Sequence, residues 1–333
     1  MQRRRRRRRF QLVFNFLLFL LLLIALNFLL HHVRQEDPAG DREPPEVDSN
    51  HLRGLFPYLI NEPYKCRERR AAPFLVFMIT TEAPHVDRRN AIRRTWADES
   101  LMPAVGIVRI FLLGKHDGEA GSGEQRTLRK ESRKYRDLIQ QDFLDSYKNL
   151  TLKIWMGLHW VARYCPRATY VMKTDSDMFI NTENLILKLL RPDSKPKTNY
   201  FTGKVLKNLS PHRDKTSKWY VSKDEYPEEK YPDFCSGTGY VLSGDLAPKI
   251  YAVAPSVRKV YLEDVYVGLC LAKLGLKPTE PADAFWFNHL RVPAVGCRYN
   301  RLITSHQLRP EEIVQCWKAH RDNKKKCATD VDV

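Results

Sequence analysis

Two aspartates stand one residue apart, directly after an apolar run that has the character of a buried strand. Asp175 and Asp177 enclose Ser176, and residues 168–174 form the run that precedes them. Carboxylate oxygens are hard ligands that suit Mg²⁺ or Mn²⁺, and these ions bridge phosphate oxygens. An isolated pair of this kind is more often a solvated turn, so it gains weight only from the elements around it. The spacing predicts a divalent-cation site at the carboxyl end of a strand.

A second acidic pair, Glu263 and Asp264, opens a segment whose next turns are apolar. Carboxylates at a helix start are favoured by the helix dipole, so the pair has a purely structural interpretation. The same position at the edge of a pocket suits a general base that takes a proton from a hydroxyl nucleophile. The two interpretations are compatible, and we expect a helix that begins at this pair.

Between the acidic pairs, residues 234–240 place Gly237 and Gly239 around Thr238. Glycines let the backbone come close to a ligand, and they are almost as typical of a plain turn. The polar segment before them carries four aromatic residues: Trp219, Tyr220, Tyr226 and Tyr231. Exposed aromatic rings can stack on the faces of sugars, or they can pin a long loop.

Strands and helices are predicted to alternate along the part of the chain that leads to these residues. The predicted strands are apolar runs at residues 74–80, 105–113 and 168–174. The predicted helices run from Pro84 to Trp96, over residues 124–136 and over residues 150–164. This alternation predicts an α/β fold with a mainly parallel central sheet, whose ligands lie at the carboxyl ends of the strands.

The first thirty residues predict where the rest of the chain lies. The chain has 333 residues, and its 56 Lys and Arg exceed its 39 Asp and Glu by 17. Seven of these cations form one run at residues 3–9, and residues 10–30 follow it without any charge. At about 1.5 Å per residue, a helix of that length spans roughly 30 Å, the thickness of a bilayer core. The positive-inside rule then predicts a single-pass type II protein with residues 1–9 in the cytoplasm.

The remaining charge argues against a protein that binds nucleic acid. Without the seven arginines, 49 of the 56 cations face 39 anions, so no uniformly basic surface is implied. Residues 31–70 are rich in charge and proline and are predicted to form a luminal stem. Residues 71–333 are predicted to form the luminal folded domain.

Two further features agree with a translocated body. The triplets Asn149-Leu150-Thr151 and Asn208-Leu209-Ser210 are N-glycosylation acceptors. All seven cysteines follow the predicted anchor, on the side where disulfides persist, and their odd number leaves at least one unpaired within the chain. We expect these cysteines to be structural, with their connectivity left open.

Six motifs, in order, resemble those of the animal β-1,3-galactosyltransferases, which form glycosyltransferase family 31. They are RNAIRRTW at residues 89–96, FLLG at 111–114, DFLDSYKNLT at 142–151, YVMKTDSD at 170–177, FCSGTGY at 234–240 and EDVYVG at 263–268. The resemblance covers residues 57–320, and residues 59–66 resemble the galactosyltransferase branch in particular. Arg94 and Ala97 depart from it, because the family commonly has an acid and a glycine there.

The resemblance implies a GT-A type fold and a Golgi membrane location behind an N-terminal transmembrane helix. It also implies Mn²⁺, with Mg²⁺ as an alternative, and UDP-galactose as the sugar donor. The implied reaction inverts the anomeric centre and joins galactose in β-1,3 linkage to a terminal N-acetylglucosamine of a glycoprotein or glycolipid glycan.

The resemblance also implies roles for individual residues. The metal ligands would be Asp175, Asp177 and His306, although the sequence alone does not choose between His306 and His289. The general base would be Asp264. The implied donor-binding residues are Thr80, Arg89, Arg93, Lys173, Asp175 and Ser176. The implied acceptor-binding residues are Trp219, Tyr220, Gly237, Thr238 and Glu263.

Three other functions compete with this interpretation. A β-1,3-N-acetylglucosaminyltransferase would keep the fold and change the donor. An inactive luminal glycan-binding module would have lost a metal carboxylate or the base, whereas Asp175, Asp177 and Asp264 are all present. A glycoside hydrolase could use Asp177 and Asp264 as its acid pair, and it would resist chelation of metal ions.

Overall fold

The computed structural model describes residues 56–69, 71–116 and 123–328. The predicted cytoplasmic tail and the predicted anchor at residues 10–30 lie outside these residues, as does most of the predicted stem. Within the described residues, no helix is both long enough and apolar enough to cross a membrane.

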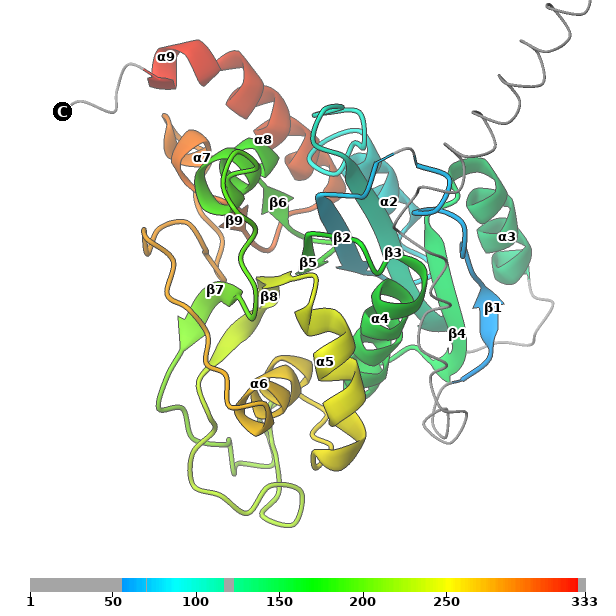
Figure 1. The fold of residues 1–333 in the computed structure, drawn as a ribbon, viewed down its shortest axis with the longest axis vertical. Coiled ribbons are helices and arrows are strands. Elements are labelled where there is room, and N and C mark those ends of the chain that lie inside the picture. The colour runs from blue at the N-terminus through cyan, green and yellow to red at the C-terminus, as the bar shows by residue number, and fades with distance from the viewer. Residues whose placement is uncertain (1–55, 70, 117–122, 329–333) are drawn as a thin grey trace, which may run out of the picture. The chain divides into compact units, whose positions relative to one another are not determined.

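A seven-stranded sheet forms the centre of the fold (Figure 1). In spatial order its strands are β1 (Tyr58–Ile60), β4 (Leu138–Leu144), β3 (Ile107–Lys115), β2 (Leu75–Thr80), β5 (Tyr170–Asp175), β8 (Phe234–Ser243) and β7 (Phe201–Leu206). The strands β4, β3, β2 and β5 are parallel, whereas β1, β8 and β7 each run antiparallel to a neighbour. The prediction of a mainly parallel central sheet is therefore confirmed.

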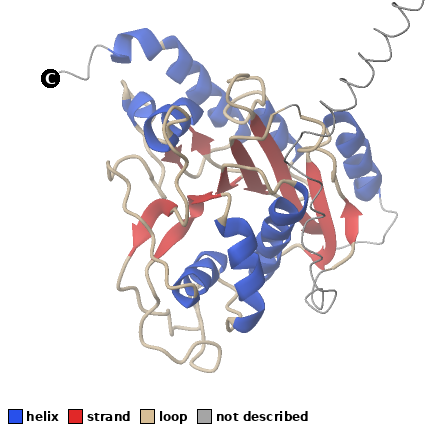
Figure 2. Ribbon diagram, in the orientation of Figure 1, coloured by secondary structure: helices blue, strands red, loops and turns tan. Residues whose placement is uncertain are grey.

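Helices cover both faces of the sheet (Figure 2). They are α2 (Val86–Arg93), α3 (Gly123–Tyr135), α4 (Leu150–Tyr164), α5 (Leu246–Val253), α6 (Glu263–Lys273), α7 (Arg298–Arg301), α8 (Pro310–Asp322) and α9 (Lys324–Ala328), with short turns η2 (Tyr147–Asn149) and η4 (Ala254–Ser256) and the π-helical η3 (Asn184–Leu190). Figure 1 shows α4, α5 and α6 gathered along one face. Successive side chains of β2 alternate between two cores, because Phe77 packs on the α2 side and Met78 packs on the α4 side.

The predicted boundary between stem and domain is wrong. Strand β1 already belongs to the sheet, since Tyr58 and Ile60 pair with Gln141 and Gln140 of β4. A disulfide between Cys66 and Cys165 ties the same segment to the end of α4. The folded part therefore begins before residue 71, because a short strand without a hydrophobic period of its own gives no signal in the sequence.

The cysteines divide into paired and unpaired groups. A second disulfide joins Cys297 to Cys327, and Cys235, Cys270 and Cys316 are free and buried. Three cysteines of the described residues are thus unpaired, which agrees with the prediction of at least one unpaired cysteine.

Two local predictions differ from the structure. Residues 234–240 form the first part of the ten-residue strand β8, so the alternative of a plain turn is wrong. The predicted helix from Pro84 to Trp96 is shorter, because α2 covers only Val86–Arg93 and Trp96 lies beyond it in a turn. Trp96 is fully buried there, and its indole donates to the carbonyl of Met178 at 2.9 Å.

Candidate active site

The predicted metal carboxylates lie where β5 ends. Strand β5 finishes at Asp175, which pairs with Thr80 at the end of the neighbouring parallel strand β2. Asp177 follows in the turn before β6 (Phe179–Ile180), and β6 pairs with β9 (Thr304–Ser305). This small second sheet brings the segment after β9, which contains His306, to the end of β5.

His306 completes a cluster with the two aspartates. One ligand atom from each of Asp175, Asp177 and His306 lies within 4.8 Å of the others. The Nε2 atom of His306 is 3.3 Å from Oδ2 of Asp177. The Nδ1 atom of His306 lies 3.0 Å from the backbone oxygen of His289, an arrangement that orients Nε2 toward the carboxylates. His289 therefore contributes its carbonyl rather than its ring, and the structure favours His306 over His289 as a ligand.

This donor set fits a hard divalent cation. Two adjacent ligands of an octahedral ion, each at about 2.1 Å, lie roughly 3.0 Å apart, which is close to the separation of Asp177 and His306. Burial opposes the ionised form of Asp177, but the hydrogen bond and the charge of His306 outweigh it and lower the pKa of Asp177. Burial likewise opposes charged His306, and the Asp177 partner raises the pKa of the imidazole. Without a metal, the proton on His306 therefore pairs with Asp177, and a cation bound between the two ligands would take the place of that proton.

Asp175 is held from two sides. The hydroxyl of Thr80 donates to Oδ1 of Asp175 at 2.6 Å, and the ammonium of Lys173 lies 2.9 Å from the same oxygen. Both of these contacts are made to Oδ1 and neither to Oδ2, and the side chain of Asp175 is 31% exposed. Ser176, between the two aspartates, is buried.

The second acidic pair opens α6, as predicted, and its two carboxylates lie in different surroundings. Asp264 is half-buried, and it accepts hydrogen bonds from the backbone N–H of Gly237 at 3.0 Å and of Val265 at 2.9 Å. Burial raises the pKa of Asp264 even though these bonds favour its ionised form. An oriented carboxylate with a raised pKa has the properties of a general base.

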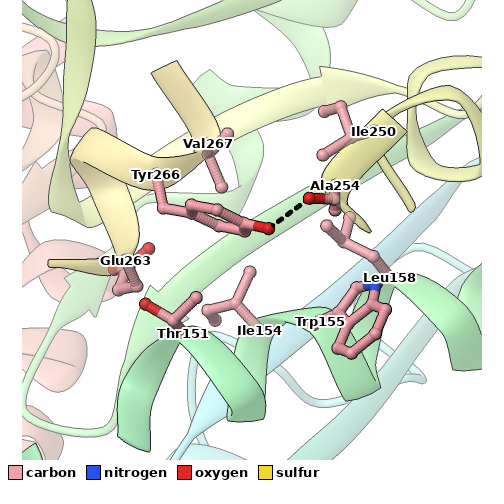
Figure 3. Close-up of a pocket in the computed structure, with 9 residues that line it drawn as sticks. All are labelled: Thr151, Ile154, Trp155, Leu158, Ile250, Ala254, Glu263, Tyr266 and Val267. Carbon is pink, nitrogen blue, oxygen red and sulfur yellow. Dashed lines mark hydrogen bonds between the residues drawn. The ribbon is translucent and has the colours of Figure 1, made fainter. Parts of the chain in front are cut away.

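Glu263 points into the protein. Its carboxylate lies 2.5 Å from the ammonium of Lys173, and its other oxygen accepts a hydrogen bond from the Tyr240 hydroxyl at 3.3 Å. Figure 3 shows Glu263 beside Thr151 at the edge of a cavity of about 10 Å³ with otherwise mainly apolar walls. Burial raises the pKa of Glu263 to about 7, with Lys173 opposing the shift. The expectation that Glu263 contacts the acceptor therefore does not fit its position, because its side chain is 5% exposed.

Arg89 and Arg93 lie elsewhere, in a buried network of ion pairs. Arg89 contacts both oxygens of Glu131 at 2.8 Å, and its remaining donors reach the carbonyls of Glu82 and Ala83. Arg93 pairs with both Glu131 and Asp137 at 2.7 Å. The expectation that these two arginines meet a diphosphate directly is thus not supported, because their guanidinium groups are engaged inside the fold.

Arg88, one residue earlier, faces the carboxylate cluster instead. Its guanidinium donates to the carbonyl of Leu308 at 3.3 Å, while the N–H of Leu308 donates to the carbonyl of Asp177 at 2.9 Å. Its charge helps to lower the pKa of Asp177, after the contribution of His306. No pattern in the sequence shows which side of α2 is buried, and Arg88 and Arg89 are consecutive residues whose side chains point about 100° apart around the helix axis.

Aromatic side chains gather beside the start of α6. Trp219 is 44% exposed and Tyr147 is 46% exposed. The ring of Tyr147 lies 6.2 Å from that of Tyr261 in an edge-on arrangement. The Tyr261 hydroxyl reaches the carbonyls of Lys218 and Tyr220, which anchors the loop that carries Trp219. Burial and then the charge of Asp264 raise the pKa of Tyr147 to about 12, so the cluster lies within electrostatic reach of that carboxylate.

Trp219 and Tyr220 are among the residues predicted from the sequence to bind the acceptor, whereas Tyr147 and Tyr261 were not assigned to the site. By contrast, Tyr226 and Tyr231 are buried and pack against each other at 5.0 Å, which supports the interpretation that they pin the loop. Thr238 lies on β8, and its hydroxyl is 3.2 Å from that of Ser236. A tyrosine that begins a short helical turn, as Tyr147 does, or precedes a helix, as Tyr261 does, carries no sequence signal that separates it from a core residue.

The two glycosylation triplets have different environments. Asn208 is exposed and has a positive φ of 56°. Asn149 donates its side-chain amide to the carbonyl of Leu144 at 2.8 Å, and Thr151 of the same triplet is buried. The folded protein therefore presents Asn208 freely and Asn149 less so.

The comparisons with known proteins identify the class. The Galactosyltransferase family model matches residues 87–282, and this chain belongs to that family. Beta-1,3-galactosyltransferase 2 of Homo sapiens is 54% identical over 272 residues, which are 81% of this chain and 63% of that protein. Beta-1,3-galactosyltransferase 1 of Mus musculus is 50% identical over 262 residues, 79% of this chain and 78% of that protein.

The chain thus matches less than two thirds of the length of the galactosyltransferase 2 relatives. A solved structure of the galactosyltransferase LgtC has a TM-score of 0.37 and 10% identity, over 78% of this chain and 96% of that one. That likeness is too slight to assign a fold.

Proposed function

We propose that this chain transfers galactose from UDP-galactose to the 3-hydroxyl of a terminal N-acetylglucosamine, with inversion to a β-1,3 linkage. The observation that carries the proposal is the pairing of a two-carboxylate and histidine cluster with a separate, oriented carboxylate at the start of α6. Membership of the galactosyltransferase family and the printed names of its relatives support the choice of sugar and linkage. A GT-A type fold is part of the same proposal.

The donor side is assigned to the carboxylate cluster. Asp175, Asp177 and His306 would hold Mn²⁺, or Mg²⁺ in its place, and the bound ion would supply Lewis-acid neutralisation of the diphosphate charge. Thr80 and Lys173 orient Asp175 from behind. Arg88 is the cation that we assign to the diphosphate, because a guanidinium can donate two parallel hydrogen bonds to phosphate oxygens.

The acceptor side is assigned to Asp264 and the aromatic cluster. The two backbone N–H groups that bind Asp264 fix its orientation, and its raised pKa strengthens it as a base toward a hydroxyl group. Asp264 would take the proton of the acceptor 3-hydroxyl as that oxygen attacks the anomeric carbon from the face opposite the leaving diphosphate. Trp219, Tyr220, Tyr147 and Thr238 would contact the acceptor sugar, with Gly237 holding the base.

A two-donor assay tests the proposal. The full-length chain, purified in detergent, is incubated with UDP-galactose or UDP-N-acetylglucosamine and a panel of acceptors, and product linkages are determined. We expect a β-1,3-galactosyl product that disappears on chelation and returns with Mn²⁺. Turnover with UDP-N-acetylglucosamine alone would overturn the donor assignment, and turnover that survives chelation would overturn the metal assignment. Glycan binding without turnover of either donor would favour an inactive module.

The membrane location is a proposal of its own. Residues 1–30 are proposed to form a type II signal anchor of the Golgi membrane, with the catalytic domain in the lumen. Protease protection of tagged chains in intact Golgi vesicles tests the orientation. A shift on glycosidase treatment that is lost in Asn208→Gln would support luminal exposure, and a protease-sensitive C-terminal tag would overturn it.

A further inference from the structure

Lys173 is a buried cation whose donors are all used inside the protein. Its side chain is 1% exposed, and its ammonium contacts Oδ1 of Asp175 at 2.9 Å and Oε1 of Glu263 at 2.5 Å. The third partner is the carbonyl oxygen of Gly237. A lysine ammonium has three N–H donors, so none remains for a phosphate. The expectation that Lys173 contacts the nucleotide does not fit this geometry.

Gly237 joins this lysine to the general base. Its carbonyl accepts from Lys173, and its N–H donates to Oδ2 of Asp264 at 3.0 Å. A Cβ added at this position would lie 2.5 Å from Oε1 of Glu263 and 3.3 Å from Oδ2 of Asp264. Strand β8 can approach the start of α6 this closely only because residue 237 has no side chain.

Glu263 completes the connection between Lys173 on β5 and the start of α6. It is adjacent in sequence to Asp264 in the first turn of α6, and its two oxygens are held by Lys173 and Tyr240. Lys173 and Asp175 lie two residues apart on β5, so both side chains leave the same face of that strand. The ion pair therefore connects the strand that carries the metal carboxylate to the helix that carries the base.

We propose that Lys173 and Glu263 are positioning residues, which act as a buried strap through Gly237 and hold Asp264 at a fixed place relative to Asp175. The inference rests on the proposed function, and it assigns neither residue to substrate. Transfer requires the base and the leaving group on opposite sides of one anomeric carbon, so an error in their separation lowers the rate without weakening either binding step. A misplacement of about 1 Å can cost roughly 100-fold in rate.

Two separate glutamate variants distinguish a positioning role of the strap from a purely structural role. Glu263→Gln keeps the size of the side chain and removes its charge. Glu131→Gln removes a buried, ion-paired carboxylate of the same kind in the Arg89 and Arg93 network, away from the site. We expect Glu263→Gln to lower kcat at least tenfold, with KM for the acceptor and Kd for UDP measured by calorimetry both within threefold. Glu131→Gln should lower the melting temperature and leave kcat within twofold.

Lys173→Met is the second test of the strap. The double variant Lys173→Met with Glu263→Gln keeps this test interpretable if Lys173→Met alone fails to fold. Removing both partners avoids leaving an unpaired buried charge, so the double variant should be the more stable of the two. If the pair acts as one unit, the double variant should lose no more kcat than the more damaging single variant. Lys173→Met and the double variant should both bind UDP within threefold of the wild type, because Thr80 still donates to Oδ1 of Asp175.

Distinct results would overturn the strap. A Kd for UDP raised tenfold in Lys173→Met would return the lysine to the nucleotide site, and a raised acceptor KM in Glu263→Gln would return the glutamate to the acceptor site. Equal kcat losses in Glu263→Gln and Glu131→Gln would make the role merely structural. Each of these outcomes leaves wild-type transfer intact, whereas a wild-type chain without any transfer would remove the proposed function itself.

Discussion

Asp177 and His306 approach to 3.3 Å although one follows strand β5 and the other follows β9 near the end of the domain. The approach depends on the small β6–β9 sheet, in which Phe179 pairs with Ser305 and Ile180 with Thr304. The backbone N–H of Leu308 also donates to the carbonyl of Asp177 at 2.9 Å. The ligand pair is therefore set by backbone pairing on both sides, which explains how a distant histidine is delivered to the carboxylates.

This arrangement predicts different effects for two histidines. His306→Ala should weaken Mn²⁺ binding at least tenfold, because it removes a ligand atom. His289→Ala should leave Mn²⁺ affinity within threefold, because the alanine keeps the carbonyl that accepts from His306. Titration calorimetry with Mn²⁺ in the presence of UDP measures both. Equal losses in the two variants would contradict the assignment of His306 as the ligand.

The proposed base predicts a selective loss of rate. Asp264→Asn keeps the shape of the side chain and removes the proton acceptor, so kcat should fall by about 100-fold to 10,000-fold. The Kd for UDP should stay within threefold, because Asp264 lies outside the metal cluster. Asp224→Asn, at an exposed position, is the matched control and should keep the wild-type rate. A transfer rate that survives in Asp264→Asn would show that another group accepts the proton.

The orientation of α2 about its axis predicts which arginine contacts the sugar donor. Arg88→Met should raise the Kd for UDP at least tenfold, because a hydrogen bond to a charged group contributes roughly 1.5–3 kcal/mol. Arg94→Met removes an exposed arginine of the same segment that donates to the carbonyl of Asn90, and it should leave the Kd unchanged. Calorimetry with UDP and Mn²⁺ separates the two. Unchanged binding in Arg88→Met would exclude this residue from the donor site.

The buried ion pairs predict a fold that loses stability in acid. Burial opposes the ionised forms of Glu131 and Asp137. Arg89 and Arg93 outweigh it and lower the pKa of Glu131, and Arg93 and Arg109 outweigh it and lower the pKa of Asp137. A carboxylate with a lowered pKa in the folded state stabilises the fold above its unfolded pKa, and the contribution disappears as pH falls through the folded value. The melting temperature should therefore decrease as the pH is lowered below about 4.5, where glutamate in the unfolded chain begins to take up protons.

Asp137→Asn checks the source of this dependence. It breaks a buried pair and should cost about 3–5 kcal/mol of unfolding free energy at pH 7. It should also flatten the acid dependence measured by denaturant titration at several pH values. An acid dependence as steep as in the wild type would place its source elsewhere.

Much of the fold and the position of the acidic pairs followed from local sequence patterns. The apolar runs marked β2, β3 and β5, and the two aspartates lie at the end of β5, the edge where ligands of such sheets usually bind. What failed depended on position around a helix or on distant partners. The choice of Arg88 over Arg89 depends on which side of α2 faces Glu131, and the role of Lys173 depends on Glu263 and Gly237, which approach only after folding.

The aromatic cluster makes the last prediction, on the acceptor side. Tyr147→Ala removes an exposed ring next to Trp219 and Tyr261, and an aromatic contact of about 1 kcal/mol corresponds to a fivefold rise in acceptor KM. Tyr147→Phe keeps the ring and should keep KM within twofold, which separates stacking from hydrogen bonding by the hydroxyl. Donor KM should not change in either variant. A rise in acceptor KM that is equal in Tyr147→Phe and Tyr147→Ala would show that the hydroxyl, rather than the ring face, contacts the sugar.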